Sequence, residues 1–84
     1  MTPITDLTTL RDALRDFCAA RDWHRFHTPK NLVMALSVEA AELVEHFQWA
    51  TPEESLSLPP EKRAEVADEI ADVLIYLTEL ADVL

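Results

Sequence analysis

The fold is decided by residues 61–84, EKRAEVADEIADVLIYLTELADVL, which directly follow Pro59 and Pro60. Apolar side chains recur in this stretch every three or four positions, with no glycine or proline to interrupt them. That spacing places them on one stripe of an α-helix. The stripe consists of Val66, Ile70, Val73, Leu74, Leu77, Leu80, Ala81 and Leu84. The segment therefore predicts a long helix that is buried along one side.

Residues 29–49 carry a second apolar stripe behind a helix-start signal. Thr28 is a good N-cap, and Pro29 suits the first helical position because no intrahelical N–H is needed there. The stripe consists of Leu32, Val33, Leu36, Ala40, Leu43 and Phe47. We therefore predict a second helix from Pro29 to about Trp49.

A further helix is predicted at the start of the chain, over residues 7–21. Thr5 or Asp6 is available as its N-cap. Its apolar side chains again recur at intervals of three and four: Leu7, Leu10, Leu14, Phe17 and Cys18. The other face of this helix is charged, so we expect it to be solvated.

The connection between the second and third predicted helices contains a capping box, Thr51-Pro52-Glu53-Glu54. In a capping box the side chains of the first and fourth residues accept hydrogen bonds from each other's backbone N–H groups. A short helical turn is therefore predicted inside this connection. We expect Leu56 and Leu58 to pack it against the core.

Together the three main helices predict one small all-α domain, a helical bundle over residues 1–84. The composition is globular, with 49% hydrophobic and 27% charged residues. A domain of this size buries only about 60–65% of its surface on folding, so a lone three-helix core is marginal. We therefore expect a homo-oligomer, dimer or tetramer, to complete the core.

Composition excludes several classes of function. The chain has no glycine, and Gly-rich phosphate loops need glycine for close backbone approach. Its single cysteine, Cys18, leaves no internal disulfide, and no short Cys/His zinc motif is present. With 16 acidic and 7 basic residues, unaided binding to nucleic acid is unfavourable. No leader or apolar run of about 18 residues occurs, so we expect a cytoplasmic protein without a membrane span.

Four carboxylates carry the chemistry that the sequence suggests. Glu39 and Glu42 are three positions apart on the second helix, and Glu69 and Asp72 repeat that spacing on the third. Residues three apart lie about 60° apart around a helix, so each pair shares a face at the edge of its apolar stripe. Two antiparallel helices then present four acids to one point. Such a cluster needs a cation, and its hard oxygen ligands suit Mg²⁺, with Mn²⁺ as the alternative.

The acid spacing alone also fits a solvated helix surface. Glu65 with Asp68 and Glu79 with Asp82 have the same spacing, and such pairs are common on exposed faces. A di-iron bundle is excluded, because it needs Glu-x-x-His on its helices and none of the three histidines follows a glutamate at that distance.

Several short strings resemble the MazG-like all-α nucleotide pyrophosphohydrolases, and within them the dCTP pyrophosphatase branch. EAAE (39–42) followed by EIAD (69–72) is similar to the acidic signature of the family. The strings that narrow the resemblance to the branch are RDW (21–23), FH (26–27), PKNL (29–32), FQW (47–49) and DVLIYL (72–77). The resemblance extends from about Leu10 to Ala81.

The resemblance implies hydrolysis of a nucleoside triphosphate between its α and β phosphates, which yields the monophosphate and pyrophosphate. It implies dCTP or a modified dCTP as substrate, a role in clearing unwanted nucleotides, and Mg²⁺ held by Glu39, Glu42, Glu69 and Asp72. Glu45, three positions beyond Glu42, is our own hypothesis for an acid that orients the attacking water. A solvated position fits Glu45 equally well.

Aromatic side chains are the candidates for binding the base. Trp23, His27 and Trp49 are expected to form a stacking pocket above the metal, which in the family is completed between subunits. The alternative for Trp23 is that it plugs the end of the bundle. Lys30, Asn31 and Tyr76 are candidates for contacts with phosphate or sugar oxygens, and Lys30 also fits a solvated first-turn position.

One departure from the family pattern bears on activity. Relatives continue into a further helix with a lysine or arginine, an asparagine and a tyrosine-proline pair that help to bind the triphosphate, whereas here Leu84 is the last residue. We expect the parent sequence to continue, and weak or lost catalysis where that helix is missing. The competing interpretation is a non-catalytic helical interaction module that retains the fold as an oligomerisation core.

Overall fold

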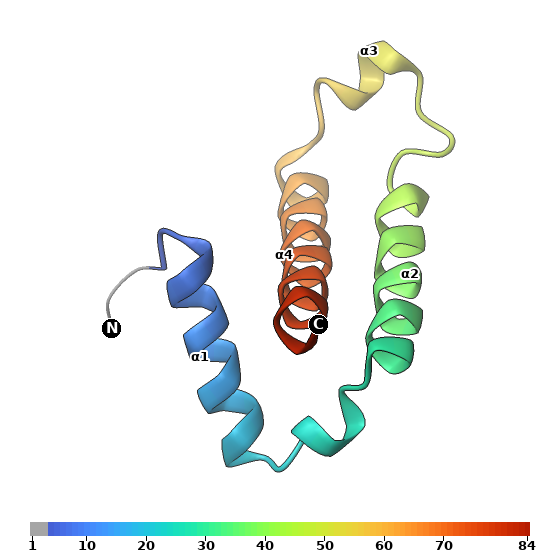
Figure 1. The fold of residues 1–84 in the computed structure, drawn as a ribbon. Helices are drawn as coiled ribbons and strands as arrows, with labels where there is room; N and C mark the ends of the chain where they lie inside the picture. Colours follow the sequence, from blue (N-terminus) through green and yellow to red (C-terminus); the bar gives the residue numbers. More distant parts are fainter. Residues whose placement is uncertain (1–3) are drawn as a thin grey trace.

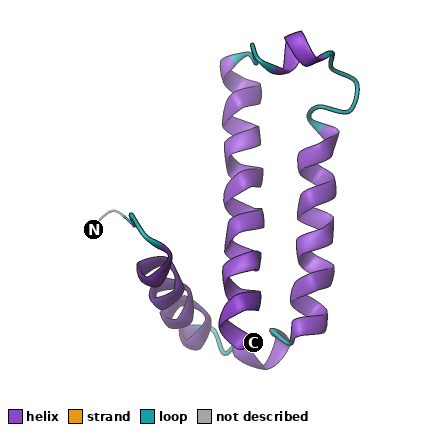
Figure 2. Ribbon diagram, turned by 45° about the horizontal axis from the view of Figure 1, so that its top comes forward, coloured by secondary structure: helices purple, strands orange, loops and turns teal. Residues whose placement is uncertain are grey.

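The computed structural model describes residues 4–84, and all the regular elements in this part of the chain are helices. In chain order the elements are α1 (Leu7–Ala20), η1 (His24–Phe26), α2 (Pro29–Glu45), α3 (Pro52–Ser55) and α4 (Pro60–Val83). The long helices α2 and α4 lie antiparallel and side by side, and α1 lies on the other side of α4 (Figures 1 and 2). The all-α prediction with three main helices is confirmed. None of the described helices has the length and apolarity needed to cross a membrane.

Helix α1 begins at a side-chain cap and ends in a turn closed by backbone hydrogen bonds. At its start the Asp6 carboxylate accepts a hydrogen bond from the Thr9 N–H at 2.7 Å. At its end the Trp23 N–H donates to the Cys18 carbonyl at 3.0 Å and the Asp22 N–H donates to the Ala19 carbonyl at 3.2 Å. This is the Schellman arrangement, and Asp22 takes its left-handed position with φ of 56°. The turn directs Trp23 back against α1.

Helix α2 begins as predicted but ends earlier. The Thr28 hydroxyl accepts from the Asn31 N–H at 3.2 Å, so the predicted cap is confirmed. The helix stops at Glu45 rather than at Trp49. The next two N–H groups bond to carbonyls only three residues back: His46 to Leu43 at 3.3 Å and Phe47 to Val44 at 2.9 Å. This tightening turns the chain ahead of Thr51, which is extended because it precedes a proline.

The predicted capping box is confirmed in α3. The Thr51 hydroxyl accepts from the Glu54 N–H at 3.1 Å, and the Glu54 carboxylate accepts from the Thr51 N–H at 3.2 Å. The prediction for Leu56 is wrong, because its side chain is 86% exposed, whereas Leu58 is half-buried. The connection that holds α3 passes beyond the ends of α2 and α4 (Figure 1), so Leu56 does not reach the core.

The core of a single chain is small. Leu32, Val66 and Cys18 are its buried apolar side chains among the residues described. Many predicted stripe residues are instead largely exposed, including Val33 on α2 and Ile70 on α4. Burial of this apolar surface would be favourable, and the predicted oligomer therefore remains our expectation.

An ion pair fastens α1 to the far end of α4. The Arg15 Nε donates to the Asp82 carboxylate at 2.9 Å, and a second guanidinium nitrogen contacts the same group. The hydrogen bond from Arg15 lowers the pKa of Asp82 below its ordinary value. This pairing offsets the unfavourable position of an acid near a helix C-terminus.

We predict that Leu32→Ala lowers the free energy of unfolding by about 2–5 kcal/mol, because it opens a cavity at a side chain that is 1% exposed. Urea unfolding followed by circular dichroism measures the change. Leu56→Ala is the matched control, and its effect should stay within about 0.5 kcal/mol. Equal losses from both substitutions would contradict this placement of the core.

Candidate functional site

Three acidic side chains meet between α2 and α4. Glu39 comes from α2, and Glu69 and Asp72 come from α4. One carboxylate oxygen of each can be chosen so that all three lie within 4.8 Å of one another. Glu42 lies one turn beyond Glu39 and close enough to affect its protonation. The antiparallel packing of α2 and α4 thus brings together acids from the two pairs, Glu39/Glu42 and Glu69/Asp72, that the sequence pointed to.

The electrostatics of this acid cluster are unfavourable without a cation. Burial raises the pKa of Glu39 to about 7, and contacts with the carboxyls of Glu69 and Glu42 and the charge of Asp72 add to the shift. One oxygen of Glu39 and one of Glu69 are buried without a hydrogen-bond partner. Buried polar atoms are normally paired. Their oxygen chemistry and their unpaired state fit a hard divalent cation such as Mg²⁺.

Glu45 is not brought into the acid cluster. It is the last residue of α2 and its side chain is exposed. Its role in orienting water stays a hypothesis.

A groove between α1 and α4 collects three of the predicted substrate-binding residues: Trp23, His27 and Tyr76. It has a volume of about 410 Å³ and its walls are mainly apolar side chains. The Trp23 ring packs edge-on against Phe17, with 5.5 Å between the ring centroids. Burial, together with the charges of Glu39, Glu79 and Asp72, raises the pKa of Tyr76. The hydroxyl of Tyr76 therefore lies in the field of the acid cluster while its side chain lines the groove.

The other predicted binding residues lie apart from this groove. Trp49 is 90% exposed and follows the C-terminal end of α2, whereas Trp23 precedes its N-terminal end. The 17 residues of α2 span about 25 Å. One chain alone therefore does not bring both tryptophans into the predicted pocket. For Trp49 to line that pocket, it must come from a second copy of the chain.

Lys30 and Asn31 lie on the first turn of α2. Lys30 is exposed. The Asn31 side-chain amide donates to the Phe26 carbonyl at 2.8 Å. That bond holds the η1 connection against α2, so the amide N–H that makes it is already used within the chain.

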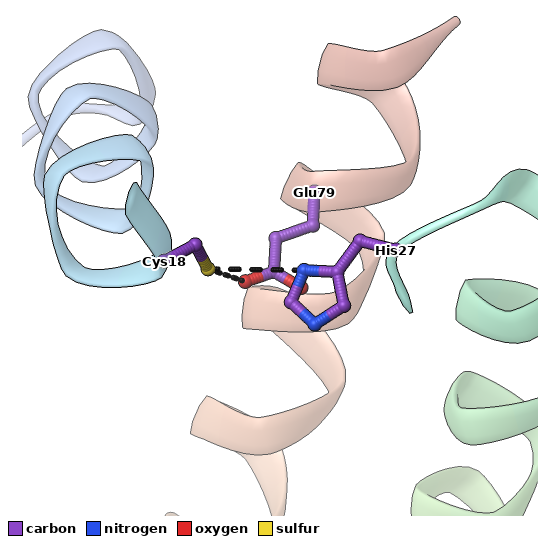
Figure 3. Close-up of side chains that lie close together, drawn as sticks. All are labelled: Cys18, His27 and Glu79. Atoms are coloured by element: carbon purple, nitrogen blue, oxygen red, sulfur yellow. Dashed lines mark hydrogen bonds and ion pairs between the residues drawn. The ribbon is translucent and has the colours of Figure 1, made fainter. Parts of the chain in front are cut away.

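A second cluster was not predicted from the sequence. Cys18 at the end of α1, His27 after η1 and Glu79 on α4 point toward one another (Figure 3). The Cys18 Sγ lies 3.7 Å from the His27 Nδ1 and 3.6 Å from the Glu79 Oε1. The three residues come from separate segments and form no local motif, so spacing gave no signal for them.

The sequence and the fold of this chain are similar to those of known proteins. A family model described as the MazG-like family matches residues 34–84. The chain is 44% identical to dCTP pyrophosphatase 1 of Mus musculus and 44% identical to that of Homo sapiens, in each case over 94% of this chain and 48% of the relative. It thus spans about half the length of these relatives. A crystal structure of a pyrophosphatase from Archaeoglobus fulgidus superimposes with a TM-score of 0.85 at 44% identity, covering 99% of this chain and 78% of that one.

The raised pKa of Glu39 predicts a specific pH dependence for the protein stripped of metal with EDTA. Between its ordinary value of 4.5 and its folded value of about 7, the folded state binds more protons than the unfolded state. The free energy of unfolding contributed by this group therefore falls as the pH rises through that window. Glu39→Gln should remove this part of the fall and stabilise the metal-free protein at about pH 8.

Urea unfolding at several values between about pH 5 and pH 8 measures this difference. Asp68→Asn, at an exposed acid on α4, is the control and should keep the wild-type slope. A Glu39→Gln slope equal to that of the wild type would show that Glu39 titrates normally.

Proposed function

Because this chain belongs to the MazG-like family, we propose that it hydrolyses a nucleoside triphosphate, dCTP or a modified dCTP, to the monophosphate and pyrophosphate. One observation carries the proposal. Buried carboxylate oxygens of Glu39 and Glu69 stand unpaired beside Asp72, in a chain of net charge −9. A cation that satisfies those oxygens also screens a triphosphate from the acidic protein. The likeness to proteins named dCTP pyrophosphatase 1 supports this choice of substrate.

The metal in this proposal is Mg²⁺, or Mn²⁺ as its alternative, held by Glu39, Glu42, Glu69 and Asp72. When bound, it supplies a Lewis acid for phosphoryl oxygens and lowers the pKa of a coordinated water. The four carboxylates on the packed α2–α4 pair would set the position of the cation. Positioning and charge neutralisation account for most of the catalysis in phosphoryl transfer.

The groove between α1 and α4 is the proposed site of the nucleoside. Trp23 offers a partly exposed ring for stacking, and His27 and Tyr76 offer polar atoms at the same surface. The position of Tyr76 near the acid cluster would connect the nucleoside end of the substrate to the phosphate end. Lys30 and Asn31 remain candidates for contacts with phosphate or sugar oxygens.

A second copy of the chain completes the site in this proposal. Trp49 is almost fully exposed at the far end of α2, where it is available to the groove of another subunit. Such a dimer or tetramer would also cover the apolar side chains that α2 and α4 leave exposed. The assembled homo-oligomer would be the active enzyme, and its role would be to clear unwanted nucleotides.

That exposed apolar surface also favours the second candidate, a non-catalytic oligomerisation module. The two candidates differ in what the acid cluster is for. Buried, unpaired carboxylates weaken a purely structural bundle, whereas an enzyme needs them for its metal. Replacing one of the acids therefore separates the two functions.

We predict that Asp72→Asn lowers kcat for conversion of dCTP to dCMP and pyrophosphate by at least about 100-fold, because a metal ligand is lost. Product chromatography with Mg²⁺ and a panel of deoxynucleoside triphosphates, including 5-methyl-dCTP, measures it. Asp68→Asn is the matched control, since Asp68 is an exposed acid one turn earlier on α4. Equal rates for both variants would refute the site. Wild-type protein that folds but neither binds Mg²⁺ nor turns over any nucleotide would favour the oligomerisation module.

A second prediction concerns the groove. Trp23→Ala should raise KM for the preferred nucleotide by at least about fivefold, because stacking on the base is lost, while Mg²⁺ affinity stays unchanged. Steady-state kinetics and Mg²⁺ titration give the two values. Phe26→Ala removes a nearby exposed aromatic ring that lies outside the groove, and it should leave KM near the wild-type value. A loss of Mg²⁺ affinity with unchanged KM would contradict the placement of the base.

A further inference from the structure

We propose that Cys18, His27 and Glu79 form a Zn²⁺ site, separate from the acid cluster, that fastens α1 to α4. The three side chains come from α1, from the connection that follows η1, and from α4 (Figure 3). They supply one sulfur, one imidazole nitrogen and one carboxylate oxygen. This ligand set is typical of zinc and differs from the all-oxygen set of the acid cluster.

The distances within the cluster are close to those of zinc ligands, with one oxygen of Glu79 near the sulfur and the other near the imidazole nitrogen. The Cys18 Sγ lies 3.7 Å from the His27 Nδ1, the Sγ lies 3.6 Å from the Glu79 Oε1, and the Nδ1 lies 3.6 Å from the Glu79 Oε2. Zinc bonds of about 2.0–2.3 Å at tetrahedral angles place neighbouring ligand atoms about 3.4–3.6 Å apart. The side chains therefore need only small adjustments to hold the ion.

The Cys18 sulfur makes two contacts in the range of hydrogen bonds to sulfur, but the cluster is left incompletely satisfied. The Glu79 Oε2 is buried without a hydrogen-bond partner, and Cys18 is only 3% exposed. A small cavity of about 20 Å³ adjoins all three side chains, which is room for about one water or one ion. Arg15 also lines this cavity, but its charge is already paired with Asp82.

The proton balance of binding is simple. The Cys18 thiol releases its proton to solvent and coordinates as the thiolate. His27 binds through Nδ1, so its Nε2 keeps the hydrogen and remains free to donate to another group. With three protein ligands, a water fills the fourth position of a tetrahedral ion. The site thus leaves His27 able to face the groove.

The cluster joins α1 and the connection after η1 to a part of α4 that is distant from both in sequence. Cys18 and His27 are 9 positions apart, and Cys18 and Glu79 are 61 apart. A metal bound only by the folded chain stabilises it by mass action. Zinc binding here should therefore hold the wall of the α1–α4 groove and raise the melting temperature.

The test uses the full chain, stripped with EDTA and titrated with Co²⁺ as a spectroscopic substitute for Zn²⁺. We expect one equivalent of Co²⁺ to produce a thiolate-to-metal charge-transfer band in the near ultraviolet. Zn²⁺ should abolish the band by competition, and Mg²⁺ should not. Saturating Zn²⁺ should raise Tm by about 5 °C or more. A missing band, or a band without any Zn²⁺ effect on Tm, overturns the proposal.

Variants assign the ligands independently of nucleotide turnover. Cys18→Ser should abolish the band, and Glu79→Gln, which keeps the side-chain shape, should weaken Co²⁺ binding at least about tenfold. His24→Gln replaces a histidine on the same cavity wall, and Glu39→Gln removes an acid of the other site. Both controls should keep the thiolate-to-Co²⁺ charge-transfer band of the wild type.

If Cys18→Ser fails to fold, Glu79→Gln decides the question, since circular dichroism reports its folding. Wild-type affinity in a folded Glu79→Gln variant, or a band lost equally in Glu39→Gln, overturns the assignment. Failure of the proposed hydrolase activity leaves these readouts unaffected, because none of them depends on turnover.

Discussion

The repulsion among the carboxylates between α2 and α4 is the constraint on which the rest of the structure depends. Apolar packing around Leu32 and Val66 brings the two helices together, and the same approach forces Glu39 against Glu69 and Asp72. The helices cannot separate the charges without exposing the core. Burial and the neighbouring acids raise the pKa of Glu39 to about 7, so near neutral pH the metal-free chain is partly protonated where its proposed function needs a cation. At the acid cluster between α2 and α4, the carboxylates that the proposed function needs therefore lower the stability of the metal-free chain.

Helix α4 contributes to two clusters with different ligand atoms: the acid cluster and the cluster of Cys18, His27 and Glu79. Glu69 and Asp72 face α2 with oxygen ligands alone, and Glu79 faces α1 and the η1 connection together with sulfur and nitrogen. Tyr76 lies between them and is affected by charges from both sides. Because hard and soft ligand sets favour different metals, the proposed Mg²⁺ and Zn²⁺ sites can coexist on one helix without competing for the same ion.

The sequence predicted those features that depend on periodicity and local hydrogen bonding. The helices, the Thr28 and Thr51 caps and the approach of Glu39 to Glu69 and Asp72 follow from spacings of three or four residues, and the structure has each of them, although much of the apolar stripes is exposed. The early end of α2 and the exposure of Leu56 depend on where the chain must turn, which no short window encodes. The Cys18 cluster required the three-dimensional arrangement, since its members are far apart in the chain.

The left-handed Asp22 has a consequence for how this molecule tolerates change. The position of Trp23 in the groove is set by the backbone of its neighbour, because the Schellman turn requires a positive φ at residue 22. Without glycine anywhere in the chain, an aspartate performs this task, and asparagine or glycine could replace it. A β-branched residue could not do so without strain. If Trp23 binds the nucleotide as proposed, selection would also constrain Asp22, although the Asp22 side chain need not touch the nucleotide.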